Sequence, residues 1–259
     1  MAILDTPRGR IGFDDNCLTR PATPLLFLHG VGSDKRVWAP QLAHVRSRRA
    51  IAIDYPGYGE SEFVAAATRD DFAAAGWATL DALGIDRVIL CGLSLGGVVA
   101  IAMYHAAPER CAGLVIADSF AVHPDGAAIH QRSVAASSAL PMRAVAEARV
   151  PLLVGEHASA RLRAELVETM AAIDPAAFRL GSAAVWLADQ HDRIGAIAVP
   201  TLILVGDQDR VTPPALSRAL QQQIAGSRME IINGAGHLPN VEQAEKFNAS
   251  LDRLCALID

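Results

Sequence analysis

The chain has 259 residues, of which 51% are hydrophobic, 20% are charged and 5% are aromatic. This composition is typical of a folded protein with an aliphatic core, and it excludes a largely disordered chain. The net charge of −5 at pH 7, together with the lack of basic residues alternating with aromatic ones, argues against a protein that binds nucleic acid. Because α/β folds of this length often form one unit, we expect a single domain with an insertion.

The sequence shows no targeting or membrane pattern. The first residues, Met1 to Arg8, lack the charged start and apolar stretch of a signal peptide, and no apolar run approaches the roughly 18 residues of a membrane span. The four cysteines are far apart and show neither C-x-x-C nor metal-ligand spacing. We therefore expect a cytoplasmic protein with reduced thiols, no membrane contact and no nucleic-acid partner.

Short apolar runs alternate along the chain with longer amphipathic stretches, a pattern that is typical of βα units and a mostly parallel sheet. After a hairpin before residue 20, strands are expected at 24–29, 50–54, 87–92, 113–118, 201–206 and 229–232. Helices are expected near 35–47, 69–83, 95–107, 214–225 and 242–258. The predicted architecture is a mostly parallel central sheet flanked by helices.

The alternation is interrupted over residues 119–199. This interval contains alanine-rich helical pieces and several prolines but no convincing strand. A right-handed crossover between parallel strands needs only about a dozen residues, so the interval is several times longer than the connection requires. We expect residues 119–199 to form a helical lid above the carboxyl ends of the strands, and residues 1–118 and 200–259 to form the core.

The segment 92–97, with the sequence GLSLGG, has the pattern of a nucleophile elbow, because a predicted strand precedes it and a predicted helix follows it. A serine at such a sharp turn has a strained backbone, and the residues two positions away must be small. Gly92 and Gly96 meet this requirement. We therefore interpret Ser94 as a nucleophile rather than as an ordinary serine in a glycine-rich turn.

A serine nucleophile needs a histidine base and an acid that orients the histidine. His237 follows the last predicted strand, and Asp209 follows the strand before it. We expect Ser94, Asp209 and His237 to meet as a triad at the carboxyl edge of the sheet. Two other acids are alternatives to Asp209: Asp207, which suits a turn, and Asp118, which ends another strand.

Acyl transfer also needs donors for a developing oxyanion, usually two backbone N–H groups. Leu95 begins a predicted helix, where free N–H groups and the helix dipole favour negative charge. Val31 follows the sequence FLHG at the end of an early strand. We expect the N–H groups of Val31 and Leu95 to form the oxyanion hole, and His29 to shape the loop before Val31.

Five motifs resemble, in order, the landmarks of the α/β-hydrolase fold superfamily: HG (29–30), DYPGYGES (54–61), GLSLGG (92–97), GDQD (206–209) and GH (236–237). The resemblance spans nearly the whole chain, and it implies an α/β-hydrolase fold with a triad in the order Ser, Asp, His. Within that superfamily, three segments resemble the 3-oxoadipate enol-lactonase-like branch: CGLSLGG (91–97), HAAPER (105–110) and HLPNVEQ (237–243). Those lactonases often carry Asn-Ser where this chain has His29-Gly30.

These motifs predict a cofactor-independent serine hydrolase that acts on a small carboxylic ester or lactone, with an enol-lactone as one candidate substrate. A C–C bond hydrolase on the same scaffold is an alternative, because the same triad can act on vinylogous diketones. A ligand receptor of this fold with little turnover is a further alternative. Dehalogenases and epoxide hydrolases of this fold carry an aspartate at the elbow, so Ser94 argues against them.

The substrate pocket is harder to predict than the triad. His29, Phe120, Met142 and Trp186 are candidates for substrate contacts, with Phe178 as a further apolar candidate. The lid histidines lack the short spacing that would hold a metal, so no metal is expected: His123, His130, His157 and His191. Most lid arginines should lie on solvated faces, but they include candidates for holding a substrate carboxylate: Arg132, Arg143, Arg149, Arg161, Arg163 and Arg179.

Overall fold

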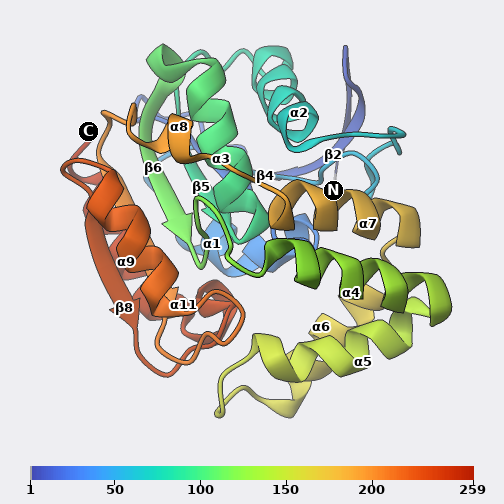
Figure 1. The fold of residues 1–259 in the computed structure, drawn as a ribbon. Coiled ribbons are helices and arrows are strands. Elements are labelled where there is room, and N and C mark those ends of the chain that lie inside the picture. The colour runs from blue at the N-terminus through green and yellow to red at the C-terminus, as the bar shows by residue number, and fades with distance from the viewer. Residues whose placement is uncertain (1) are drawn as a thin grey trace.

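The computed structural model describes residues 2–259, which form an eight-stranded sheet with helices around it (Figure 1). The strand order is β1-β2-β4-β3-β5-β6-β7-β8. β2 pairs antiparallel with β1 and β4, whereas the other neighbours pair in parallel. The strands are β1 (Ala2–Thr6), β2 (Gly9–Asp15), β3 (Leu25–Leu28), β4 (Ala50–Ile53), β5 (Val88–Leu93), β6 (Cys111–Ala117), β7 (Thr201–Gly206) and β8 (Arg228–Ile232). The predicted α/β fold is confirmed, and β1 and β2 form the expected hairpin.

Burial of both faces explains why the central strands are continuous apolar runs in the sequence. Every residue of β3, β4, β5, β6 and β7 is buried, as expected for parallel strands whose two faces are both covered. β1 and β8 lie at the edges of the sheet and have exposed and half-buried residues. The core is therefore built on both faces of the central strands.

The helices of the core follow the predicted segments. The longer ones are α1 (Ala39–His44), α2 (Arg69–Ala82), α3 (Leu95–Ala106), α9 (Pro214–Gln223) and α11 (Ala244–Cys255). The short ones are η1 (Lys35–Trp38), η2 (Pro108–Arg110) and α10 (Pro239–Glu242). A capping box of Thr68 and Asp71 begins α2. In Figure 1, α2 and α3 pack together in front of the sheet, whereas α1 lies behind it and contacts α11.

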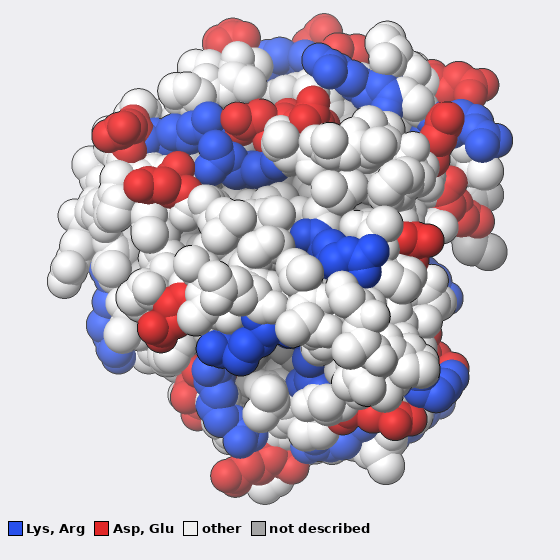
Figure 2. Space-filling model, turned by 45° about the vertical axis from the view of Figure 1, so that its right-hand side comes forward, with Lys and Arg blue, Asp and Glu red and all other residues white. Residues whose placement is uncertain are grey.

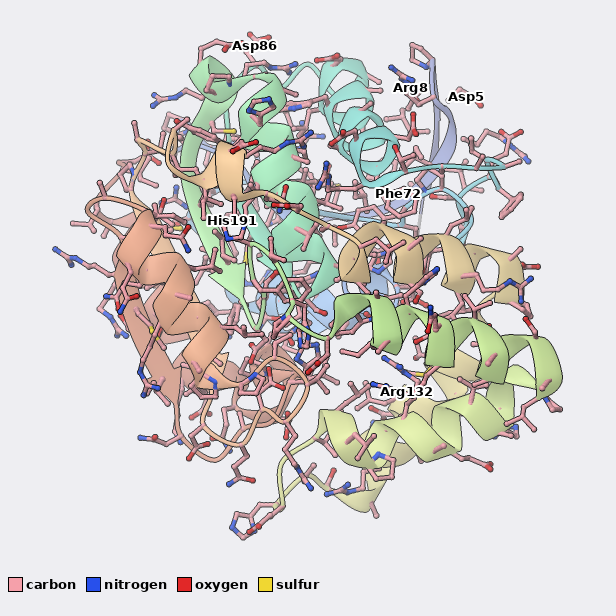
Figure 3. The ribbon with its side chains drawn as sticks, in the orientation of Figure 1. Asp5, Arg8, Phe72, Asp86, Arg132 and His191 are labelled. Atoms are coloured by element: carbon pink, nitrogen blue, oxygen red, sulfur yellow. The ribbon has the colours of Figure 1, made fainter. Side chains whose placement is uncertain are left out.

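Residues 119–199, called the helical insertion below, connect β6 to β7. They contain α4 (Gly126–Ala139), α5 (Met142–Leu153), α6 (Ala160–Ala171), α7 (Pro175–Trp186) and α8 (His191–Ile194). An isolated bridge joins Val122 to Asp189. α4 packs against α7 and α5 against α6, at the lower right of Figure 1. Arg132 projects from α4 on the side that faces α5 (Figure 3).

Hydrogen bonds tie the helical insertion to the loops that follow β7 and β8. Glu242 accepts from Gly155 N at 2.6 Å, and Gln208 accepts from Glu156 N at 2.8 Å. The backbone N–H of His237 donates to the carbonyl oxygen of Leu153 at 2.7 Å. The end of α5 is therefore held directly over the loop that carries His237.

A buried ion pair supports the turn after β4. Lys35 Nζ lies 2.6 Å from Asp54 Oδ2 and 2.7 Å from Glu60 Oε2, and the Asp54 carboxylate also accepts from the backbone N–H of Lys35 and Glu60. Burial lowers the pKa of Lys35, but the hydrogen bonds that Lys35 donates to these two carboxylates more than offset that effect and raise it. The network holds this turn against the start of η1.

Charged side chains of both signs are interspersed over the face drawn in Figure 2, and basic side chains gather around a hollow in its lower half. Among residues 2–259, no helix is both long and apolar enough to cross a membrane.

Candidate active site

Ser94 occupies the sharp turn between β5 and α3. Its φ of 56° and ψ of −113° lie outside the regions that residues with a side chain normally adopt. Two contacts hold the strained residue: its N–H donates to Ala117 O at 2.8 Å, and its carbonyl oxygen accepts from Ser119 Oγ at 2.8 Å. The turn therefore has the geometry of a nucleophile elbow.

Two glycines make this turn possible. A Cβ at Gly92 would collide with the carbonyl oxygen of Gly96, and a Cβ at Gly96 would collide with the carbonyl oxygen of Leu28. A Cβ at Gly30 would lie 3.4 Å from the Cβ of Ser94. The backbone at the end of β3 and the start of α3 thus approaches Ser94 closely, as the sequence pattern requires.

His237 and Asp209 lie on the loops after β8 and β7 and form a hydrogen-bonded pair. His237 Nδ1 is 2.8 Å from Asp209 Oδ2, and both side chains are buried. Asp209 Oδ2 also accepts from Thr212 Oγ1 at 2.6 Å, while Oδ1 accepts from the N–H groups of Val211 and Thr212 at 2.8 and 3.0 Å. These four hydrogen bonds fix the carboxylate relative to the imidazole.

The same contacts keep Asp209 ionised. Burial by itself raises the pKa of this carboxyl, but the charge of His237 and the hydrogen bonds from His237 and Thr212 outweigh burial and hold it well below its usual range. An ionised acid beside Nδ1 directs the imidazole proton to Nδ1 and leaves Nε2 free to accept a proton.

The two alternative acids, Asp207 and Asp118, make contacts that differ from those of Asp209. Asp207 Oδ1 accepts from Gly234 N at 2.7 Å and Ala235 N at 3.3 Å, so this carboxylate holds the loop that carries His237. Asp118 accepts from Gly206 N at 2.9 Å through Oδ1, while its buried Oδ2 has no hydrogen-bond partner among residues 2–259. Burial, followed by the charge of Asp209, raises the pKa of Asp118 well above its usual range. Asp118 is therefore a buried carboxyl with a raised pKa beside the pair.

Asp118, Asp209 and His237 also bring ligand atoms within 4.8 Å of one another, which is the spacing of a metal site. The facing atoms of Asp209 and His237 are already joined to each other, however, and Thr212 donates to the same carboxylate oxygen. The raised pKa of Asp118 also disfavours ligation, because metals bind the ionised carboxylate. The arrangement fits an acid and base pair better than a metal centre.

His29 supports the loop that leads to Val31. Its Nδ1 is 2.8 Å from Gly30 O, and its Nε2 accepts from Tyr55 N at 3.3 Å. A carbonyl oxygen only accepts and a backbone N–H only donates, so the ring is neutral with its proton on Nδ1. Burial lowers the pKa of His29, which is consistent with this neutral form. Val31 follows this fixed loop, and Leu95 is the first residue of α3.

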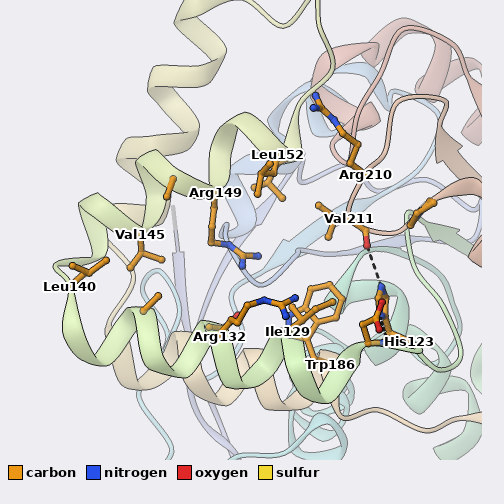
Figure 4. A pocket seen from close by; sticks show the side chains of 16 residues that line it. His123, Ile129, Arg132, Leu140, Val145, Arg149, Leu152, Trp186, Arg210 and Val211 are labelled. Atoms are coloured by element: carbon orange, nitrogen blue, oxygen red, sulfur yellow. Dashed lines mark hydrogen bonds between the residues drawn. The ribbon is translucent and has the colours of Figure 1, made fainter.

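Two neighbouring cavities share part of their lining, and Ser94 lines the inner one. The inner cavity has a volume of about 20 Å³, and its lining includes Val31, Ser94 and His237. The outer cavity has a volume of about 530 Å³ and lies between α4, α5 and the loop after β7 (Figure 4). Three residues line both cavities: Arg149, Leu153 and Trp186.

The residues that were predicted to contact substrate lie at different distances from these cavities. Trp186 lines both of them. Phe120 is buried behind Trp186, with the two rings stacked at 5.7 Å. Met142 and His29 are buried and are not among the residues that line either cavity. Substrate contact by any of these four residues stays a prediction.

Sequence reasoning missed two residues that position the pair. Thr212 donates to Asp209, and Glu242 accepts from Gly236 N at 2.9 Å and Leu238 N at 3.2 Å, on either side of His237. Thr212 could have been found, because an aspartate followed by a turn commonly accepts hydrogen bonds from residues two and three positions later. The sequence carries no comparable signal for Glu242, whose contacts depend on the folding of α10 against this loop.

The sharp turn at Ser94, the hydrogen-bonded pair of His237 and Asp209 and the order of the strands are typical of the α/β-hydrolase class. The alpha/beta hydrolase family model matches residues 25–250, and the chain belongs to this family. It is 29% identical over 231 residues to 3-oxoadipate enol-lactonase 1 of Acinetobacter baylyi, with 87% of this chain and 86% of that protein covered. The resemblance to the enol-lactonases is thereby confirmed.

Two further proteins that resemble this chain are named for other activities. The chain is 31% identical over 243 residues to the 2-hydroxymuconate semialdehyde hydrolase of a Pseudomonas species, with 86% of this chain and 83% of that protein covered. The solved structure of a thermophilic esterase from Thermogutta terrifontis superposes with a TM-score of 0.90 at 26% identity, covering 99% and 98% of the two chains. The relatives are thus named for three different hydrolytic activities: enol-lactonase, 2-hydroxymuconate semialdehyde hydrolase and esterase.

Proposed function

We propose that the chain is a serine hydrolase that cleaves a small carboxylic ester or lactone, with an enol-lactone among the candidates. Ser94 is the nucleophile, His237 the general base and Asp209 the acid that orients His237. The observation that carries this proposal is the buried 2.8 Å contact between His237 and Asp209, with His237 and Ser94 lining one cavity. The 29% sequence identity to an enol-lactonase and the structural similarity to an esterase support a carboxylic ester as the bond that is cleaved.

The proposed reaction has two halves. Ser94 Oγ attacks the carbonyl carbon while its proton passes to His237 Nε2, and the resulting oxyanion accepts hydrogen bonds from the N–H groups of Val31 and Leu95. The C–O bond then breaks, and the leaving alkoxide takes the proton from His237. In the second half, water gives a proton to His237 and attacks the acyl-enzyme, which releases the acid and restores Ser94. An ester and water thus become an acid and an alcohol without a cofactor.

We further propose that the helical insertion acts as a lid over the core formed by residues 1–118 and 200–259. The inner cavity has room for about one water molecule, whereas the outer cavity of about 530 Å³ is within the usual range for small-molecule sites. The substrate body would occupy the outer cavity, while the scissile group enters the inner one. Because Arg149 and Leu153 of α5 line both cavities, movement of α5 would control access to Ser94.

A C–C bond hydrolase is the second candidate, because the chain is 31% identical to a 2-hydroxymuconate semialdehyde hydrolase. Purified protein should be screened against p-nitrophenyl esters, lactones, enol-lactones and a vinylogous diketone, with Ser94→Ala as the control. We expect turnover of an ester or lactone that disappears in Ser94→Ala while circular dichroism stays unchanged. Turnover that persists in the variant would overturn the mechanism, and turnover of the diketone alone would favour the second candidate.

A further inference from the structure

A further hollow, called the side hollow below, adjoins the inner cavity. It lies between α6, η1 and α10 and has a volume of about 560 Å³. Ser33 and Leu166 line both the side hollow and the inner cavity. The outer cavity shares other residues with the inner cavity and none with the side hollow. The inner cavity, which Ser94 and His237 line, therefore adjoins two separate spaces.

Two side chains bring α6 to the edge of the inner cavity. Leu166 and Met170 are buried, and both line this cavity. A Cβ at Gly32 would lie 2.5 Å from Met170 Cε, so the Met170 methyl group packs against the loop directly after Val31. A methionine side chain has three rotatable bonds and can change rotamer without a shift of the backbone. This edge of the inner cavity can therefore open through side-chain movement alone.

The polar contacts of α6 tie it to the helical insertion and not to the core. Glu168 of α6 pairs with Arg143 of α5 at 2.6 Å, and α6 lies behind α5 in Figure 1. Arg163 donates to the carbonyl oxygens of Gly155 and Ala158, in the segment before α6. Within residues 2–259, no hydrogen bond or ion pair joins α6 to η1, α10 or the sheet. Because α6 meets the core through van der Waals contacts, a passage there can widen without loss of a polar contact.

The side hollow has no charge that is left without a partner. Its charged side chains all form ion pairs: Arg36 with Asp34 at 2.6 Å, Arg161 with Glu165 at 2.7 Å, and Glu168 with Arg143 at 2.6 Å. Apart from Ser33 and Thr169, the remaining lining residues are apolar. Transfer of an unpaired charge from water into such surroundings is unfavourable, whereas transfer of an apolar group is favourable. The lining therefore suits an uncharged, mainly apolar group.

The proposed reaction needs a second route to Ser94. The alcohol leaves first, while the acyl half is still attached to Ser94. The inner cavity has room for about one water molecule, so the acyl group fills it and blocks the way to the outer cavity. The side hollow offers the alcohol, and then the attacking water, a route that the acyl group does not block. Because a lactone releases no separate alcohol, two spaces beside one nucleophile fit an open-chain ester better.

We infer that the side hollow binds the alcohol half of an open-chain ester, that this alcohol is uncharged and mainly apolar, and that Leu166 and Met170 determine its size. This inference rests on the proposed function, because the alcohol leaves from the bond that Ser94 attacks. The acyl half occupies the outer cavity, so the two halves of the substrate meet different residues. Substitutions that line the side hollow therefore change selectivity for the alcohol and not for the acid.

The first test measures kcat/KM in two series of esters that differ in which half grows. In the alcohol series of ethyl, butyl and hexyl acetate, each methylene that leaves water should raise kcat/KM by up to about fourfold. In the acyl series of ethyl acetate, butanoate and hexanoate, the growing chain enters the outer cavity instead. We also expect 3,3-dimethylbutyl acetate to exceed acetylcholine, its cationic counterpart of the same shape, by about 10-fold or more.

Substitutions on α6 assign the alcohol series to the side hollow. Ala164 is exposed and lines the side hollow, whereas Ala160 is exposed on the same helix outside that lining. Ala164→Phe should lower the ratio of kcat/KM for hexyl acetate to that for ethyl acetate by about 10-fold or more, and should leave the acyl series unchanged. The matched control Ala160→Phe should change neither series. Met170→Ala should raise kcat/KM for 3,3-dimethylbutyl acetate relative to ethyl acetate by about threefold or more.

The second test measures binding of 1-hexanol and does not require turnover. The chain has five methionines, so labelling with [methyl-13C]methionine gives few NMR signals, and Met170→Leu identifies the signal of Met170. We expect 1-hexanol to shift this signal and not that of Met103, which is buried in α3. Ala164→Phe should need about 10-fold more hexanol than Ala160→Phe for the same shift.

The outcomes separate this inference from the proposed reaction. An unchanged Met170 signal, or equal binding of hexanol by Ala164→Phe and Ala160→Phe, would overturn the inference. An effect of Ala164→Phe on the acyl series in place of the alcohol series would also overturn it, although the proposed reaction would stand. If hexanol shifts the Met170 signal but no ester is cleaved, the proposed reaction fails and the alcohol site stands.

Discussion

Replacing Thr212 with valine tests how the buried Asp209 carboxylate is stabilised. The change keeps the shape of a fully buried side chain and removes the hydroxyl that donates to Asp209 Oδ2 at 2.6 Å. The three other donors to this carboxylate remain: His237 Nδ1 and the N–H groups of Val211 and Thr212 itself. A hydrogen bond to a charged group contributes about 1.5–3 kcal/mol, so the free energy of unfolding at neutral pH should fall by this amount.

The pH dependence of this loss follows from the direction of the pKa shift. Asp209 has a folded-state pKa below its ordinary value of 3.8, so its contacts stabilise the protein at neutral pH. That contribution is lost as the pH falls through the folded-state pKa. The destabilisation by Thr212→Val should therefore be constant around neutral pH and shrink only in strong acid.

Urea denaturation at neutral pH, followed by tryptophan fluorescence, measures the effect, and Thr212→Ser is the matched control because it keeps the hydroxyl. We expect Thr212→Ser to be much closer to wild type than Thr212→Val. Hydrolysis should also slow in Thr212→Val, by at most about 100-fold if the whole loss appears in the transition state. Equal stability of wild type and Thr212→Val would refute the argument, as would equal losses in the two variants.

Three further substitutions test other parts of the site. Gly96→Ala drives a Cβ into a backbone carbonyl oxygen, so it should lower the free energy of unfolding by at least about 1–3 kcal/mol and abolish most activity. The control Gly195→Ala meets no atom within 4 Å. This control should be tolerated in the same thermal unfolding and hydrolysis assays. Asp118→Asn should keep nearly wild-type kcat, because Asp209 and not Asp118 is the carboxylate that is hydrogen-bonded to His237, whereas Asp209→Asn should lower kcat by about 10⁴-fold. The reverse order in steady-state kinetics would make Asp118 the working acid. Lys35→Met leaves a buried carboxylate without its cation and should cost about 3–5 kcal/mol in urea denaturation, and an unchanged midpoint would contradict that account.

The sequence predicted the sheet and the loops that carry Ser94, Asp209 and His237 because these features have local causes. Continuous apolar runs mark strands that are buried on both faces, and the glycines around Ser94 are required by backbone contacts within the same turn. The carboxyl ends of parallel strands meet at one edge, so the order of the strands was enough to bring the three residues to one region.

The residues that line the cavities could not be predicted from the sequence in the same way. Arg149 and Arg143 lie on the same helix six residues apart, yet Arg149 lines a cavity without an ion pair to any described residue, whereas Arg143 pairs with Glu168 on the surface. That difference depends on how α4, α5 and α7 pack, which residue type and spacing do not reveal. Trp186 and Met142 were equal candidates in the sequence for the same reason, although only Trp186 lines the cavities.

The central claim is that Ser94 forms a covalent acyl-enzyme with the help of His237, and covalent labelling tests it most directly. The protein should be treated with a fluorophosphonate probe, digested and analysed by mass spectrometry, beside Ser94→Ala and His237→Ala. We predict a single stoichiometric label on the peptide that contains Ser94, absent from Ser94→Ala and formed far more slowly in His237→Ala. A label on another residue, or none on folded wild-type protein, would contradict the account.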